Sequence, residues 1–133
     1  MSEKSEVKKS QVKVIEIITW GKDLHRGWNK APGSKWNFSA LHLGDRSKTR
    51  GLDLQHLRGD DDELYNRFVN DEDFKKTVNL CFQKVKELVT NGDCVFSINC
   101  AKGRHRSRAL ARGLGELIVK ELHIPVRLTY YDK

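Results

Sequence analysis

The sequence predicts a single α/β domain with a four-stranded, mostly parallel or mixed sheet flanked by helices. At 133 residues the chain has the usual length of one domain. Short β-branched runs alternate with longer amphipathic stretches, and this order implies βαβ crossovers and parallel strands. The domain is expected to cover residues 12–133. Residues 1–11, rich in Ser, Glu and Lys, are expected to form a disordered tail.

Four short apolar runs are the predicted strands. The first, VKVIEIIT, is β-branched and almost wholly apolar, which is typical of a buried strand. The run Leu52–Leu57 lies between the structure-breaking residues Gly51 and Gly59, and its secondary structure is ambiguous from the sequence. The predicted strands are Val12–Thr19, Phe38–Leu43, Cys94–Asn99 and Val126–Tyr130.

Two stretches with apolar residues three and four positions apart predict helices. Asn70–Thr90 begins with capping and acidic residues and is followed by Asn91-Gly92, a typical helix end. Ser107–Leu122 is the second, with Pro125 beyond its end. The acidic run Asp60–Glu63 is interpreted as the solvated start of a further helix.

Composition restricts the classes of function. The chain has no apolar run of about 18 residues that would predict a membrane span, and its first ten residues lack the apolar core of a secretion signal. Three cysteines, an odd number, predict reduced thiols in the cytoplasm. A metal site at the acidic run Asp60–Glu63 is only the second interpretation of that run, so no metal and no cofactor are predicted. The oligomeric state is left open.

The segment from Cys100 to Ser107 carries the strongest chemical signal. A predicted strand leads into it and a helix leads out, so backbone N–H groups and a helix N-terminus face one space, which suits an anion. A charged turn of this kind can also be a plain solvated surface, and Ser107 can be a helix cap instead of a ligand. The predicted phosphate-binding residues are Ala101, Lys102, Gly103, Arg104, His105, Arg106 and Ser107.

Charge is unevenly distributed along the chain, whose net charge is +7. The range 100–113 holds five cationic residues and no acid, whereas the range 60–73 holds seven acids and only Arg67. The molecule is therefore predicted to be polarised, with the positive pole at the loop. The polar segment Gly21–Lys35 contains Trp28 and lies between Trp20 and Trp36. The three tryptophans are interpreted as anchors for a long loop, with stacking on a base or sugar as the alternative.

Cys100-x5-Arg106-Ser107 resembles the phosphate loop of cysteine-dependent tyrosine and dual-specificity phosphatases. That resemblance implies Cys100 as a thiolate nucleophile, Arg106 as the phosphate clamp and an upstream acid that protonates the leaving group. Asp71 and Asp73 are the candidates for the acid. Asn99 stands where those enzymes have His.

The run Cys-x-x-Gly-Arg-His-Arg-Ser, from Cys100 to Ser107, also looks like the Cys-x-Gly-Gly-Lys-His-Arg-Ser loop of the RapZ C-terminal domain family. Thr49–Asp53 resembles that family's Thr-Gly-Leu-Asp segment, and Trp20-Gly21 its Phe-Gly-containing start, so the resemblance spans roughly residues 12–132. It implies binding of a phosphorylated aminosugar, and of RNA in the full protein. It also implies that Gly103, Arg104, His105 and Arg106 hold the phosphate, with backbone amides from Ala101 and Lys102.

The sequence therefore predicts a module that binds a phosphorylated partner: a phosphosugar, a nucleotide or the phosphates of RNA. Whether the protein is an enzyme is left open. The alternative is a phosphatase that uses Cys100 as nucleophile, with Asp71 as the acid. No membrane partner is expected.

Overall fold

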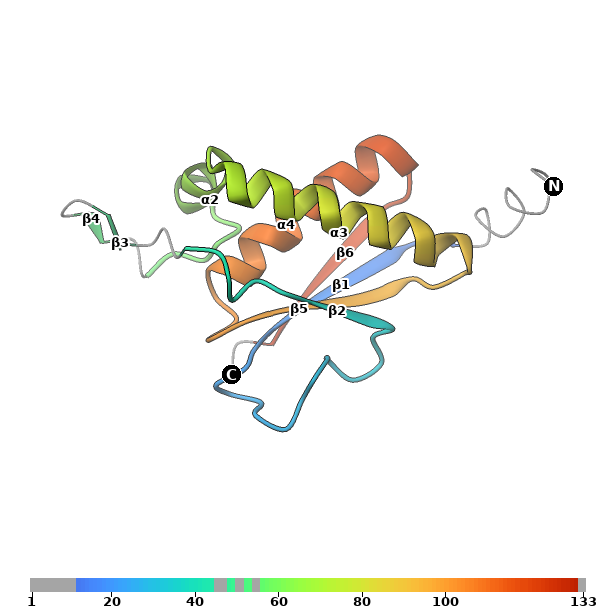
Figure 1. Ribbon diagram of the computed structural model, residues 1–133, viewed down its shortest axis with the longest axis horizontal. Helices are drawn as coiled ribbons and strands as arrows, with labels where there is room; N and C mark the ends of the chain where they lie inside the picture. The colour runs from blue at the N-terminus through green and yellow to red at the C-terminus, as the bar shows by residue number, and fades with distance from the viewer. Residues whose placement is uncertain (1–11, 45–47, 50–51, 54–55, 132–133) are drawn as a thin grey trace.

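A computed structural model of the chain describes residues 12–44, 48–49, 52–53 and 56–131. The predicted tail, residues 1–11, lies outside these ranges. In chain order the elements are β1 (Ile15–Gly21), β2 (Trp36–Ser39), β3 (Lys48–Thr49), β4 (Leu52–Asp53), α2 (Asp62–Val69), α3 (Glu72–Thr90), β5 (Val95–Cys100), α4 (Arg106–Leu122) and β6 (Val126–Tyr131) (Figure 1).

The main sheet has four strands in the order β2-β5-β1-β6, and every neighbouring pair is parallel. The predicted α/β fold is thus confirmed, and its sheet is wholly parallel. In the register of the two central pairings, Ile17 of β1 lies opposite Phe96 of β5 and Leu128 of β6. The short strands β3 and β4 form a separate antiparallel pair. Within the segment that resembles the RapZ family, Arg50 and Gly51 lie outside the described residues.

The helices of the described chain all cover one face of the sheet, and the segment 22–35 covers the other (Figure 1). The predicted flanking helices therefore lie on one side only. The reason is the connection between β1 and β2: its Gly, Pro and Asn residues have no helical periodicity, so it crosses the sheet as irregular chain.

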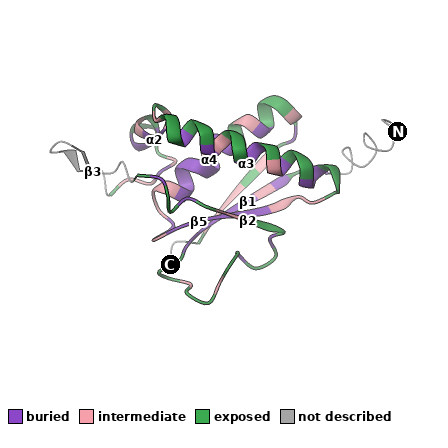
Figure 2. Cartoon of the chain, viewed as in Figure 1, coloured by how far each residue is buried: buried purple, intermediate pink, exposed green. Residues whose placement is uncertain are grey.

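The main core lies between the sheet and the helices. Alternate strand residues point into it. Those of the central strands β1 and β5, such as Ile17 and Ile98, are completely buried, whereas those of the outer strands, such as Phe38 and Leu128, are partly buried. On α4 the buried residues Leu110, Leu114 and Ile118 recur every four positions and form one stripe against the sheet. In Figure 2 the buried colour accordingly follows the inward sides of the strands and helices.

The opposite face of the sheet carries a smaller apolar cluster and a buried polar network. Trp20 is completely buried there, and its Nε1 donates to Oδ1 of Asn37 over 2.9 Å. The Asn37 amide donates in turn to Oδ1 of Asn99 over 2.8 Å, and the Ser97 hydroxyl donates to Asn37 Oδ1 over 2.8 Å. Because these buried polar groups are paired, they hold β1, β2 and β5 together beneath the segment 22–35. Trp20 thus anchors this face, as interpreted from the sequence.

The helix predicted over Asn70–Thr90 is confirmed as α3. Asp71 caps it, because its carboxylate accepts a hydrogen bond from the Asp73 amide over 2.9 Å. After Thr90 the chain turns at Asn91 and Gly92, and Gly92 has a φ of +93°, which favours glycine. Residues 62–69 form the short helix α2, which begins within the acidic run where a helix start was expected.

The four predicted strands are confirmed, but their boundaries differ from the prediction by one to four residues, and only the start of β6 at Val126 agrees. The ends of β1 and β2 have a clear structural cause. β1 continues to Gly21 instead of ending at Thr19, because the side chain of Trp20 has its own apolar cluster on the second face. β2 ends at Ser39 instead of Leu43. The apolar residues after it form a turn, in which the Leu43 amide donates to the Ala40 carbonyl over 3.1 Å.

Candidate functional site

The predicted loop joins the end of β5 to the start of α4, at the edge of the sheet where the parallel strands end. In open α/β sheets this is the edge at which ligands bind. Two hydrogen bonds fasten its beginning to the chain that follows β1: Lys22 N donates to Cys100 O, and Asp23 N donates to Ala101 O, both over 2.8 Å. The loop therefore lies directly against the first turn of the segment 22–35.

Close backbone contacts fix the path of the loop. Gly103 has a φ of +76°, and a Cβ at this position would lie 2.8 Å from Gly21 N. On the other side, Gly59 donates its N–H to Arg104 O over 2.8 Å, and a Cβ on Gly59 would overlap the carbonyl oxygen of His105. Glycine is required at both positions because the neighbouring atoms are backbone and have little freedom to move.

Several N–H groups of the loop lack a partner. Gly103 donates its N–H to the sulfur of Cys100 over 3.2 Å. The N–H groups of Ala101, Lys102 and Arg104 make no hydrogen bond to any part of the chain that the structure describes. His105 precedes α4 as its N-cap residue without a capping hydrogen bond from its side chain. The first turn of α4 therefore begins with its positive dipole end uncapped by a side chain.

Positive side chains surround these N–H groups. Lys102 is exposed at the tip of the loop, and Lys22 is exposed on the adjoining turn. Arg104 is half-buried, and its Nε is buried without a hydrogen-bond partner among the described residues. A buried guanidinium N–H without an acceptor is unfavourable, so an anion that reached this atom would be stabilised there.

Two other arginines of the basic segment, Arg108 and Arg112, face acids. Arg108 stacks on the Tyr130 ring at 3.8 Å from its centroid and lies 3.8 Å from a carboxylate oxygen of Asp60. Arg112 forms an ion pair with Asp62 at 2.7 Å. Burial, together with the hydrogen bond to Asp60, raises the pKa of Tyr130 far above its usual range. The positive and negative segments of the sequence thus meet in part.

Arg106 is directed differently from the prediction. Its Nη1 donates to the carbonyl oxygens of Leu41 at 2.9 Å and Leu43 at 3.3 Å, in the turn that follows β2. One arm of the guanidinium therefore holds the loop against that turn instead of facing a ligand. A phosphate contact from the rest of the group stays a prediction.

Cys100 and Ser107 lie beneath the loop. The Cys100 thiol is 2% exposed and donates to Oγ of Ser107 over 3.2 Å. Ser107 is completely buried in the first turn of α4, so the prediction that it caps this helix is wrong. The physical reason is its inward-facing hydroxyl, which pairs with the thiol. Asp71, the predicted acid of the phosphatase alternative, serves as the cap of α3.

Aromatic residues that the sequence did not connect to the site border the loop. His25 stacks on Trp28, with ring centroids 3.9 Å apart, and Tyr131 lies beside both rings. The one sequence signal for them was the long polar segment with its tryptophans. His25 and Tyr131 come from different elements, so their proximity was not visible in the sequence.

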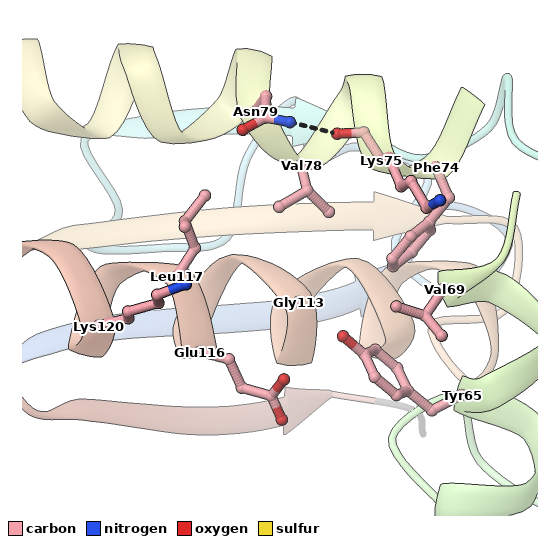
Figure 3. A pocket seen from close by; sticks show the side chains of 10 residues that line it. All are labelled: Tyr65, Val69, Phe74, Lys75, Val78, Asn79, Gly113, Glu116, Leu117 and Lys120. Atoms are coloured by element: carbon pink, nitrogen blue, oxygen red, sulfur yellow. Dashed lines mark hydrogen bonds between the residues drawn. The ribbon is translucent and has the colours of Figure 1, made fainter. Parts of the chain in front are cut away.

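A separate apolar groove of about 300 Å³ lies further along α4, between that helix, α2 and α3 (Figure 3). It includes no residue of the loop. Burial and the nearby Glu116 carboxylate raise the pKa of the Tyr65 hydroxyl at its edge. It is lined by Tyr65, Val69, Phe74, Lys75, Val78, Asn79, Gly113, Glu116, Leu117 and Lys120. Its wall is mostly apolar.

Within the described ranges, no three His, Cys, Asp or Glu side chains are grouped so that they could hold a metal ion. The helices in this part of the chain are all too short or too polar to span a membrane. No protein-family model matches the chain, and no curated protein matches it significantly.

Proposed function

We propose that the segment Cys100–Ser107 binds the phosphate group of a phosphorylated ligand. The observation that carries the proposal is the set of three backbone N–H groups, on Ala101, Lys102 and Arg104, that lack an acceptor in the described chain. They belong to a loop that leads into the N-terminus of α4, whose N-cap residue His105 makes no capping hydrogen bond through its side chain. Phosphate is a natural acceptor for such an arrangement, because its several oxygens accept many hydrogen bonds at once.

The charge around the loop supports an anionic ligand. Lys102 and Arg104 are cations beside the N–H groups, and the α4 dipole adds to their potential. Hydrogen bonds to charged groups contribute about 1.5–3 kcal/mol each. The resemblance to the RapZ C-terminal domain favours the same site. The proposal covers three ligand classes: phosphosugars, nucleotides and the phosphates of RNA. The three free thiols of the protein favour the cytoplasm as its place of action.

Calorimetric titration with inorganic phosphate and pyrophosphate tests the proposal. Lys102→Gln and Arg104→Gln should each weaken binding by tenfold or more, since about 1.4 kcal/mol corresponds to a factor of ten. The matched control is Lys76→Gln, which removes an exposed positive charge from α3 and should leave affinity unchanged. Equal affinity in all three variants, with folding verified by circular dichroism, would contradict a site at this loop.

One observation favours phosphatase activity as a second candidate. Gly103 N donates to the Cys100 sulfur, and the Ser107 hydroxyl lies 3.2 Å from it; both groups can stabilise a thiolate. In that reaction the thiolate attacks phosphorus and forms an S–P bond while the P–O bond to the leaving group breaks. The leaving oxygen takes a proton from a carboxylic acid, predicted to be Asp71, and water then cleaves the S–P bond to release phosphate.

Hydrolysis of an aryl phosphate distinguishes the two candidates. If the protein is a phosphatase, turnover should disappear in Cys100→Ser and persist in the control Cys94→Ser. The thiol of Cys94 is half-buried, one residue before β5. The binding module requires saturable phosphate binding without turnover. Under that module Cys100→Ser should retain most of the affinity, because the anion is held by N–H groups and cations instead of by sulfur.

A further inference from the structure

The outer edge of β6 carries backbone groups without partners. β6 is the last strand in the order β2-β5-β1-β6, so only its edge toward β1 is paired within the described chain (Figure 1). Ile15 N donates to Pro125 O over 2.9 Å, which fixes the phase of the parallel β1–β6 ladder. Because successive residues of a strand direct their N–H and C=O groups to alternate edges, those of Val126, Leu128 and Tyr130 point away from β1. They have no hydrogen-bond partner in the part of the chain that the structure describes.

An apolar cleft of about 390 Å³ lies beside this edge, between β6 and α4. The absence of a side chain at Gly115 keeps the two elements close, since a Cβ there would lie 3.3 Å from Cγ1 of Val126 and 3.9 Å from Cδ2 of Leu128. Val119, on the helix side of the cleft, is 48% exposed. The edge thus combines unpaired backbone groups with uncovered apolar side chains, as a strand does that accepts a further strand.

The other outer strand of the sheet, β2, is better protected. It has four residues against six in β6, and the ammonium group of Lys84 lies 4.3 Å from the centroid of the Trp36 ring at its start. Short outer strands and lysine side chains at an edge both hinder the addition of another strand. β6 contains no Lys, Pro or Gly, and its one charged residue, Arg127, is paired with Glu16 at 3.4 Å. An added strand is therefore expected at β6 and not at β2.

We infer that a second copy of this chain pairs with the edge, β6 against β6 in antiparallel direction, and forms a dimer with two-fold symmetry. An axis through Leu128 places this residue opposite its counterpart and Val126 opposite Tyr130 of the other copy. Residues paired in this way exchange hydrogen bonds in both directions, so every outward-facing backbone group of the strand obtains a partner. The two four-stranded sheets join into one, and the clefts beside α4 of the two copies face each other.

The charges beside the edge suit a second copy of the same chain. Arg112 is neutralised by Asp62 at 2.7 Å and Glu116 at 3.0 Å, so this side of α4 presents no excess positive charge in a protein with a net charge of +7. The middle of α4 lies against β6, and the two-fold axis reverses the helix direction. Lys120, which has no ion-pair partner among the described residues, is thereby brought to the level of the exposed Asp62 in the other copy.

Sedimentation equilibrium over a range of protein concentrations tests the inference. The wild-type chain should dimerise, and Val119→Lys should raise the dissociation constant about tenfold or more, because an ammonium group would enter the apolar cleft. The control Leu80→Lys makes the same kind of change at a residue of α3 that is 71% exposed, and should leave the dimer intact. A protein that stays monomeric at every concentration would leave the edge to another polypeptide and overturn the inference. A dimer that Val119→Lys does not weaken would overturn it as well.

Amide hydrogen exchange assigns the contact to β6. In concentrated wild-type protein the amides of Leu128 and Tyr130 should exchange about tenfold or more slowly than in dilute protein or in Val119→Lys. The amides of Arg127 and Thr129, which face β1, should be protected in all three samples. The dilution series gives this result without any substitution, so it holds even if the variant is unstable. A dimer in which Leu128 and Tyr130 exchange as fast as in the monomer would show association through another surface and overturn the inference.

Discussion

A closely packed glycine lies against the loop before α4 and another lies in the apolar groove further along that helix, but the atoms around the two glycines differ. Gly59 belongs to the segment before α2 that contacts the loop, and a Cβ on it would lie 2.7 Å from the Ala109 amide nitrogen and would overlap the His105 carbonyl. In the groove, a Cβ on Gly113 would lie 3.1 Å from the Val78 side chain and 3.3 Å from the Tyr65 hydroxyl.

This difference separates a fixed structure from an adaptable one. Backbone atoms in a hydrogen-bonded loop cannot shift without moving the elements attached to them, whereas the ends of side chains can change position at modest cost. A site that uses backbone N–H groups requires the fixed arrangement, because its donors must be in place before the ligand arrives. The loop has that property and the groove does not.

The largest effect is expected from Gly59→Ala. The added methyl group cannot fit against the His105 carbonyl, so the loop and the start of α4 must separate from the segment before α2. We expect a loss of about 3 kcal/mol in the free energy of unfolding, measured by urea denaturation. The control Gly27→Ala, where a Cβ meets open space, should change stability by less than about 1 kcal/mol. Equal stability of the two variants would show that the loop can accommodate a side chain at position 59 and is not rigid there.

Gly103→Ala should have the next largest effect, about 2 kcal/mol, because it combines a positive φ with a close backbone neighbour. Gly33→Ala is matched to it: the φ of Gly33 is +84°, but a Cβ there would have nothing within 4 Å. The difference between the stability losses of the two variants therefore separates the effect of the loop contact from that of backbone strain. Urea denaturation supplies the stabilities, and only Gly103→Ala should also lose phosphate affinity. An identical loss of stability in both would show that the contact contributes nothing.

High pH should destabilise the protein by ionising the Cys81 thiol, which is buried in the main core. Burial raises the pKa of Cys81 from 9.0 to about 12. The folded state therefore retains this proton when the unfolded state releases it, so the stabilisation is complete below pH 9 and is lost as the pH rises toward 12. At pH 10 the expected loss is about 1.4 kcal/mol relative to pH 8.

The matched variant is Cys81→Ala, which is less stable at every pH but should lack this part of the decline. Urea denaturation of both proteins at pH 8 and pH 10 measures the difference. Parallel declines would mean that the Cys81 thiol does not contribute to the pH dependence.

The smallest effect is expected from Gly113→Ala, in the groove. Replacing glycine inside a helix contributes up to about 1 kcal/mol of stability, and crowding against Val78 offsets part of it. We expect a net change within about 0.5 kcal/mol in urea denaturation. A loss as large as that in Gly59→Ala would make the groove as rigid as the loop and remove the distinction between them.

The fold was largely predictable because its signals are local. The apolar spacing of α3 and the β-branched run of β1 each fix an element within a few neighbouring residues. The strand boundaries were less predictable. Trp20 extends β1 because it packs on Ala31 and Trp28 of a distant segment, a contact that no local pattern announces.

The candidate site was predictable as a continuous segment but not in its internal geometry. The direction of Arg106 depends on carbonyl groups of Leu41 and Leu43, which a local pattern cannot bring to it. The inward rotation of Ser107 depends on the buried thiol beneath it. The stack of His25 beside Tyr131 depends on β1 and β6 being neighbours in the sheet. Each requires the tertiary structure.

The phosphate is proposed to bind the loop N–H groups that have no acceptor among the described residues. A ¹H–¹⁵N chemical-shift titration with inorganic phosphate tests it most directly, since it observes each N–H separately. We predict saturable shifts of the Ala101, Lys102 and Arg104 amides, with much smaller changes on α3. Unchanged signals from these three amides at phosphate concentrations that shift other parts of the protein would contradict the account.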